Sequence, residues 1–138
     1  MHLILVLALA FDLAGVKTEP NPERRSDRAL ENANAAMDAA RAAYDRGETE
    51  KTGAALDEVK DSVDLSYQSL TDSGKGPRGN AHFKSAEKAT RALLRRLESF
   101  RDTVSAAERD SVDAVRAHVS EVHDNILDGI MTNGRKRK

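Results

Sequence analysis

The chain has 138 residues, a length that fits one domain, and its formal net charge at pH 7 is −1. It contains no cysteine, which excludes disulfides, Cys-based zinc sites, a thiol nucleophile and a lipid anchor carried on a cysteine. Aromatic residues make up 4% of the sequence and charged residues 33%, and residues that favour helix dominate. This composition disfavours a β-sandwich and predicts an all-α protein. The near-neutral balance provides no overall field that would draw the protein to nucleic acid or to a membrane.

The first residues form a separate segment. Residues 3–11 are an unbroken apolar run of nine residues, far shorter than the roughly 20 needed to span a bilayer. The run contains Ala8-Leu9-Ala10, a small-x-small pattern that signal peptidase accepts. We therefore expect a signal peptide over residues 1–10, cleaved after Ala10, and a periplasmic or secreted mature protein. Only His2 stands where positive charges usually precede such a run, so a short N-terminal helix or strand packed on the domain is the alternative.

Two helices are predicted in the first half of the mature chain. Pro20 and Pro22 predict extended backbone over residues 11–21, after which Asn21 can cap a helix over 22–46. Gly47 is suited to the left-handed conformation that ends this helix. A second helix is expected over 49–72, and the short connection makes the two an antiparallel hairpin. Their expected inward positions follow helical spacing: Leu30, Ala33, Met37, Ala40 and Tyr44, then Leu56, Val59, Val63, Ser66 or Tyr67, and Leu70.

Two more helices are predicted after the Gly- and Pro-rich loop over residues 73–80. The heptad pattern of helix 80–104 slips by one residue before helix 106–131 begins, and Ser105 with Glu108 forms a capping-box pattern at the slip. We infer a tight turn there, the alternative being one bent helix that would favour a dimer. The expected inward positions are Phe83, Ala86, Thr90, Leu93, Leu97, Phe100 and Val104, then Val112, Val115, Val119, Val122, Ile126, Leu127 and Ile130, with Leu94 widening the first stripe. Four amphipathic helices of similar length predict an antiparallel four-helix bundle, as a monomer or a homodimer.

The charges are segregated along the chain. Residues 48–72 carry seven acids and two bases, whereas residues 75–102 carry eight bases and three acids. Four of these bases form what we call the cation stripe, on the helix face opposite the predicted core: Lys84, Lys88, Arg91 and Arg95. The simple interpretation is a solvated surface that helps to set which helices are neighbours. The functional interpretation is a docking surface for an anionic polymer or an unknown protein. Aromatic residues do not interleave with these cations, which disfavours nucleic acid. Residues 132–138 are expected to form a disordered basic tail.

A metal site is the alternative chemistry. His118 and Glu121 have workable i, i+3 spacing, and His123 borders the same predicted stripe. Two histidines five residues apart, however, lie on opposite edges of that stripe, and a helical zinc site prefers a spacing of three or four. The phosphate-loop and serine-hydrolase motifs are absent from the sequence. We therefore predict a non-enzymatic protein without a cofactor, with a metal- or haem-binding bundle as the alternative.

The hairpin from Tyr44-Asp-Arg-Gly-Glu-Thr-Glu-Lys51 to the Ala-Ala-Leu-Asp-Glu-Val segment ending at Val59 resembles hairpins of soluble haem-binding four-helix bundles. That resemblance implies the architecture only, because Tyr67 and Gln68 stand where a b-type bundle would place its axial histidine and the c-type motif is missing. Met37 is inward, as core methionines usually are. The chain from Phe11 onward also resembles small exported bacterial helical-bundle proteins without an assigned function, through its signal-like start, its Thr-Glu-Pro-Asn-Pro segment and its long helices. This second resemblance implies a compartment and a fold.

Overall fold

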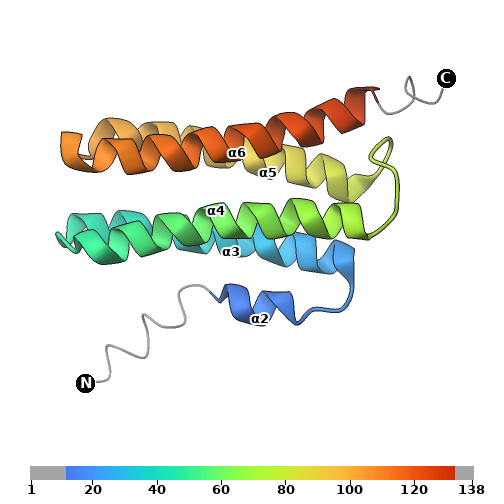
Figure 1. Ribbon diagram of the computed structural model, residues 1–138, viewed down its shortest axis with the longest axis horizontal. Helices are drawn as coiled ribbons and strands as arrows, with labels where there is room; N and C mark the ends of the chain where they lie inside the picture. Colours follow the sequence, from blue (N-terminus) through green and yellow to red (C-terminus); the bar gives the residue numbers. More distant parts are fainter. Residues whose placement is uncertain (1–11, 133–138) are drawn as a thin grey trace.

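The computed structural model describes residues 12–132, and every regular element in that range is a helix. Four long helices lie side by side (Figure 1): α3 (Pro22–Asp45), α4 (Thr49–Asp72), α5 (Ala81–Thr103) and α6 (Ala106–Thr132). The all-α prediction is confirmed, and each long helix begins and ends within one residue of its predicted range. None of the helices within residues 12–132 combines the length and apolar character that crossing a bilayer requires. The predicted signal peptide over residues 1–10 lies outside the described residues, as does the predicted tail except for Thr132.

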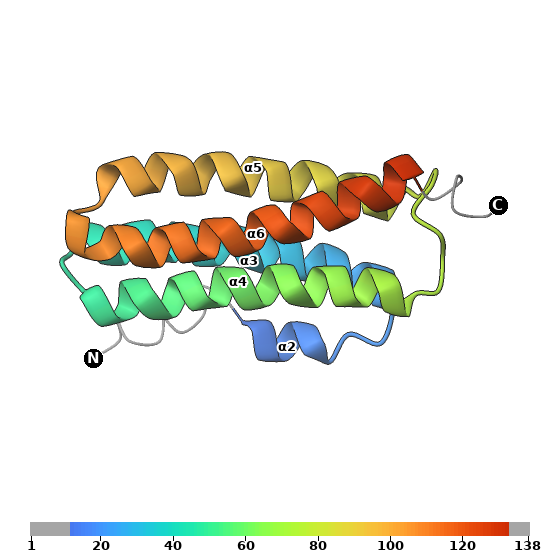
Figure 2. The ribbon, with the colours of Figure 1, turned by 45° about the horizontal axis from the view of Figure 1, so that its top comes forward.

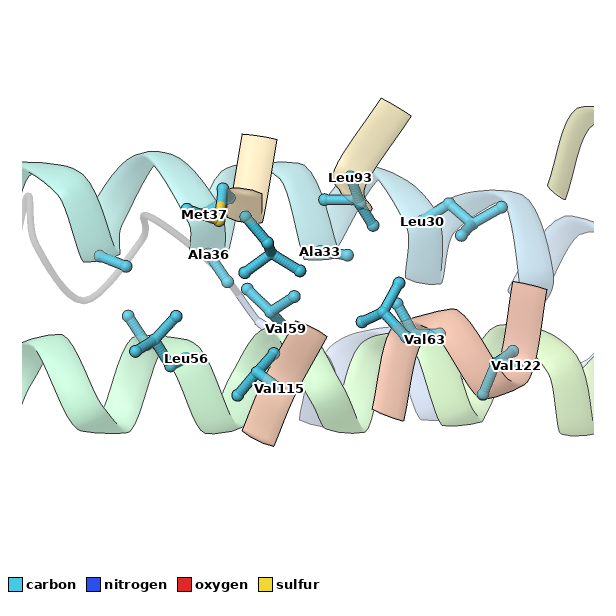
Figure 3. Packing of buried hydrophobic residues seen from close by; sticks show 14 of the residues in the cluster. Leu30, Ala33, Ala36, Met37, Leu56, Val59, Val63, Leu93, Val115 and Val122 are labelled. Atoms are coloured by element: carbon cyan, nitrogen blue, oxygen red, sulfur yellow. The ribbon is translucent and has the colours of Figure 1, made fainter. Parts of the chain in front are cut away.

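The four long helices form two layers around one core. Helices α5 and α6 make one layer and α3 and α4 the other (Figures 1 and 2). Side chains from all four helices meet between the layers, where Met37, Val59, Leu93 and Val122 are buried (Figure 3). Removing this apolar surface from water is the main force that holds the layers together.

One predicted core position is wrong. Leu127 is 37% exposed, whereas its neighbour Ile126 is buried. The buried residues of α6, spaced 3, 4, 3 and 4 apart from Val112 to Ile126, define a narrow face. Because each residue turns the helix by about 100°, Leu127 points away from that face.

Local signals in the sequence set the helix ends. The Asn21 side chain accepts a hydrogen bond from the Arg24 amide at 3.0 Å, and Pro22 begins α3. At the other end, Gly47 has φ +73°, and the amide of Glu48 donates to the carbonyl of Ala43 at 2.9 Å. This arrangement satisfies carbonyls that the end of a helix leaves free, and it requires a left-handed residue, for which glycine is best suited.

The predicted turn between α5 and α6 is confirmed, and a single bent helix is excluded. Val104 leaves the helical conformation, with φ −76° and ψ 160°. The Ser105 hydroxyl donates to the Glu108 carboxylate at 3.2 Å. The amide of Ser105 donates to the hydroxyl of Tyr44 at 2.8 Å, so a tyrosine on α3 takes the place that the glutamate has in a capping box.

A short additional helix, α2 (Leu13–Lys17), corrects the prediction that residues 11–21 are extended. Asp12 caps it by accepting from the Gly15 amide at 3.0 Å, and Pro20 restricts only the residue immediately before it. The helix packs outside the bundle (Figure 2), in contact with α3 and α4. Its Leu13 and Val16 are buried beside Ala29. Long-range contacts of this kind are invisible in local patterns.

Helices α3 and α4 are joined by a seam of small and polar side chains. Ser26 and Ser66 share a hydrogen bond at 2.7 Å, and the Asn32 amide group donates to Ser62 and to Glu58, each at 2.9 Å. The same Asn32 accepts from the Asp12 amide at 2.6 Å, and Glu58 accepts from the Leu13 amide at 3.0 Å. The seam therefore joins α2, α3 and α4.

Candidate binding surface

The apolar heptads of α5 determine which of its residues face solvent, and a cap fixes where the helix begins. The side chain of Asn80 accepts hydrogen bonds from the amides of His82 and Phe83, at 2.8 and 3.2 Å. This cap satisfies free amides at the start of the helix. Phe83 and the heptad residues after it are buried. The cation stripe (Lys84, Lys88, Arg91 and Arg95) lies on the opposite face, and all four side chains are exposed.

Most of the cation stripe has no acidic partner in the part of the chain that the structure describes. Arg91 donates to the Glu87 carboxylate at 3.0 Å. Within residues 12–132, Lys84, Lys88 and Arg95 form no ion pair with any acid. No acid among these residues neutralises their charge, which is therefore available to an anion.

A shallow groove of about 430 Å³ runs beside the stripe between α5 and α6. Its walls combine guanidinium groups with apolar surface, the lining residues being Arg91, Leu94, Arg95, Glu98, Arg116, Ala117 and Ser120. Arg116 forms an ion pair with Glu98 at 3.3 Å, and Leu94 packs partly against the core. Guanidinium groups bind carboxylates or phosphates through paired hydrogen bonds, so this groove extends the stripe with specific anion-binding groups.

Glu87 connects the stripe to α6. Its carboxylate accepts from His123 at 2.9 Å and from Arg91 at 3.0 Å, and the side chain is only 15% exposed. The hydrogen bond from His123 lowers the pKa of Glu87 below its usual value, with partial burial opposing the shift and Arg91 adding to it. Glu87 therefore holds Arg91 in place as a carboxylate.

The structure does not bring the alternative metal ligands together. His118 is 2.5 Å from Asp64 on α4, whereas His123 pairs with Glu87 on α5, so the two histidines point to different neighbours of α6. Glu121 is exposed. In the part of the chain that the structure describes, no three His, Asp or Glu side chains are grouped closely enough to hold a metal ion.

The residues compared with haem-binding bundles have ordinary positions. Met37 is fully buried in the apolar core, Tyr67 is half-buried against it, and Gln68 is exposed.

The sequence interpretation missed the pairing of histidines with carboxylates across helices. His82 on α5, for example, is 3.1 Å from Asp27 on α3. The spacing of residues within one helix carries no information about such partners. No protein-family model, curated protein or solved structure matches this chain. Its function is therefore inferred from its own surface.

Proposed function

We propose that this chain is a non-enzymatic, exported protein that folds as an antiparallel four-helix bundle and binds an anionic partner through the cation stripe. The observation that carries the proposal is the row of four exposed cations on α5, three of them without an acidic partner among residues 12–132. The signal-like first ten residues support the exported compartment.

The spacing of the stripe suits an extended or helical anion. The four residues follow each other at intervals of 4, 3 and 4, which places them along one side of α5. At 1.5 Å per residue the stripe is about 17 Å long. A single small anion would contact one or two of these cations, whereas a polymer or a protein surface can contact all four.

The test is a binding measurement with three defined polyanions: polyphosphate, an acidic polysaccharide and polyglutamate. Biolayer interferometry is run on the wild type and on a variant in which Lys84, Lys88, Arg91 and Arg95 are all changed to Glu. The wild type is expected to bind at least one polymer, with an affinity that falls as salt is added. The reversed variant is expected to bind at least tenfold more weakly.

A matched control reverses four exposed cations elsewhere, Lys17, Arg24, Lys51 and Arg78. It has the same net charge as the stripe variant, so it separates an effect of position from one of total charge. We expect it to retain binding within about threefold. Equal losses in both variants, or binding of none of the three polymers, would contradict the proposed function.

A further inference from the structure

The C-terminal end of α6 carries exposed apolar and acidic side chains, in contrast to the basic side chains of the cation stripe. Within residues 12–132, Leu127 and Met131 are the exposed large apolar side chains, at 37% and 66%. Asp124 and Asp128 flank them and are exposed too, and the four residues line a shallow depression. In this acidic and apolar patch, Asp128 forms no ion pair among residues 12–132, and Asp124 pairs only with its neighbour His123 at 3.5 Å.

The patch and the groove lie on the same side of α6. Arg116, Ser120, Asp124, Leu127 and Met131 follow each other at intervals of 4, 4, 3 and 4, which is one helix face. Because Arg116 and Ser120 line the groove with α5, the face is the one that borders α5.

Ion pairs across the hairpin show which residues lie at the same level. Glu87 pairs with His123 and Glu98 pairs with Arg116, so the two helices run in opposite directions. Lys84 lies about one turn before Glu87, and Lys88 directly follows it. Both lysines therefore lie at the level of Asp124 and Asp128 on α6. The outer face of the hairpin thus has a basic row on α5 and an acidic row on α6, side by side.

We propose that a second copy of this chain docks on the outer face of the α5–α6 hairpin. A two-fold axis parallel to the hairpin places α5 of each copy over α6 of the other. Lys84 then faces Asp128 of the second copy, and Lys88 faces Asp124. Leu127 and Met131 from both copies meet near the axis.

This inference rests on the proposed function, because it names the partner of the same cation stripe. At the Lys84–Lys88 end of the stripe a second copy fits better than an unrelated anion, since this end of the face carries both signs of charge and exposed apolar side chains. Arg91 and Arg95 lie at the level of Ser120 and Arg116, so they face no acid of the second copy. The contact is isologous, so it closes at two copies. Exposed ion pairs are individually weak, and the dimer is therefore weak and sensitive to salt.

Sedimentation equilibrium at low and high salt tests the dimer with two complementary variants. One carries Lys84→Glu and Lys88→Glu, and the other Asp124→Lys and Asp128→Lys. Each alone places like charges opposite each other, so we expect dimerisation at least tenfold weaker than in the wild type. Mixed in equal amounts, they present opposite charges at every pair and are expected to dimerise as well as the wild type.

Two further variants keep the result clear. Asp57→Lys with Asp61→Lys changes exposed acids on α4 and should leave the dimer unchanged within about twofold. Met131→Gln alters only a highly exposed side chain and should weaken the dimer at least threefold. A monomeric wild type at low salt, or a mixture that stays monomeric, would overturn the inference. If the protein is monomeric but still binds a polyanion through the cation stripe, the dimer is refuted and the proposed function stands. If it neither dimerises nor binds a polyanion, both the dimer and the proposed function are refuted.

Discussion

Asn32 is expected to be the most important polar side chain for stability. It is 7% exposed, it donates to Glu58 and Ser62, and it accepts from the Asp12 amide. A hydrogen bond to a charged group contributes about 1.5–3 kcal/mol and a neutral one about 1 kcal/mol. Because water can reach part of the site when α2 loosens, we expect Asn32→Ala to lower the free energy of unfolding by about 3 kcal/mol. For a domain of this size that corresponds to a decrease in Tm of about 10 °C.

Urea unfolding followed by far-UV circular dichroism measures this loss. The control is Asn34→Ala, since Asn34 is half-buried on the same helix and accepts from Arg96 at 3.1 Å. Its expected cost is below about 1 kcal/mol, because the partly exposed Arg96 also pairs with Asp38 and can be solvated by water when Asn34 is removed. Asn32 also holds the start of α2, so trypsin should cut after the exposed Lys17 faster in Asn32→Ala than in the control. A loss below about 0.5 kcal/mol, or equal cleavage rates, would refute the view that Asn32 joins α2 to the bundle.

Two other predictions concern pH and backbone conformation. The pKa of Glu87 is lowered in the folded state, so its contribution to stability is present above its unfolded pKa of about 4.5 and is lost as pH falls through the lower folded pKa. Glu87→Gln should therefore flatten the decrease in stability between pH 5 and 3, measured by urea unfolding at each pH. Gly47→Ala should cost about 1 kcal/mol because Gly47 has φ +73°. Gly53→Ala should stabilise by about 0.5–1 kcal/mol, because Gly53 lies inside α4 and a Cβ added there would meet no neighbouring atom within 4 Å. Thermal melts compare the two glycine variants.

Specific results would contradict the Glu87 prediction and the glycine predictions. An unchanged slope with pH in Glu87→Gln would show that the His123 contact does not favour the carboxylate in the folded protein. Equal effects of alanine at the two glycines would show that the left-handed turn after α3 is not a constraint on this chain.

The sequence predicts the long helices well because their limits are set by nearby residues. Gly47 ends α3 through its own backbone conformation, and the one-residue slip after Val104 identifies the turn before α6. The face of α5 follows from its unbroken heptads, so the exposure of the cation stripe is predictable as well. In each case the cause and its effect lie within a few residues.

The remaining features depend on contacts between distant residues. Helix α2 has only five residues. It is held by two distant side chains: Asn32 accepts from the Asp12 amide, 20 residues earlier, and Glu58 accepts from the Leu13 amide, 45 residues earlier. The pairing of His118 with Asp64 likewise follows from helix adjacency, which no single helix encodes.

The polar seam between α3 and α4 has a consequence for how uniquely the two helices are aligned. Alanines recur along the buried side of α3, at Ala29, Ala33, Ala36, Ala40 and Ala43, so sliding one helix past the other by a turn of about 5.4 Å would place alanine where alanine was. Apolar packing alone would distinguish these registers weakly. A slide of that size would separate Ser26 from Ser66 and Asn32 from Ser62, leaving polar groups without partners in the interface. The seam thus selects a single alignment from several that have similar apolar contact.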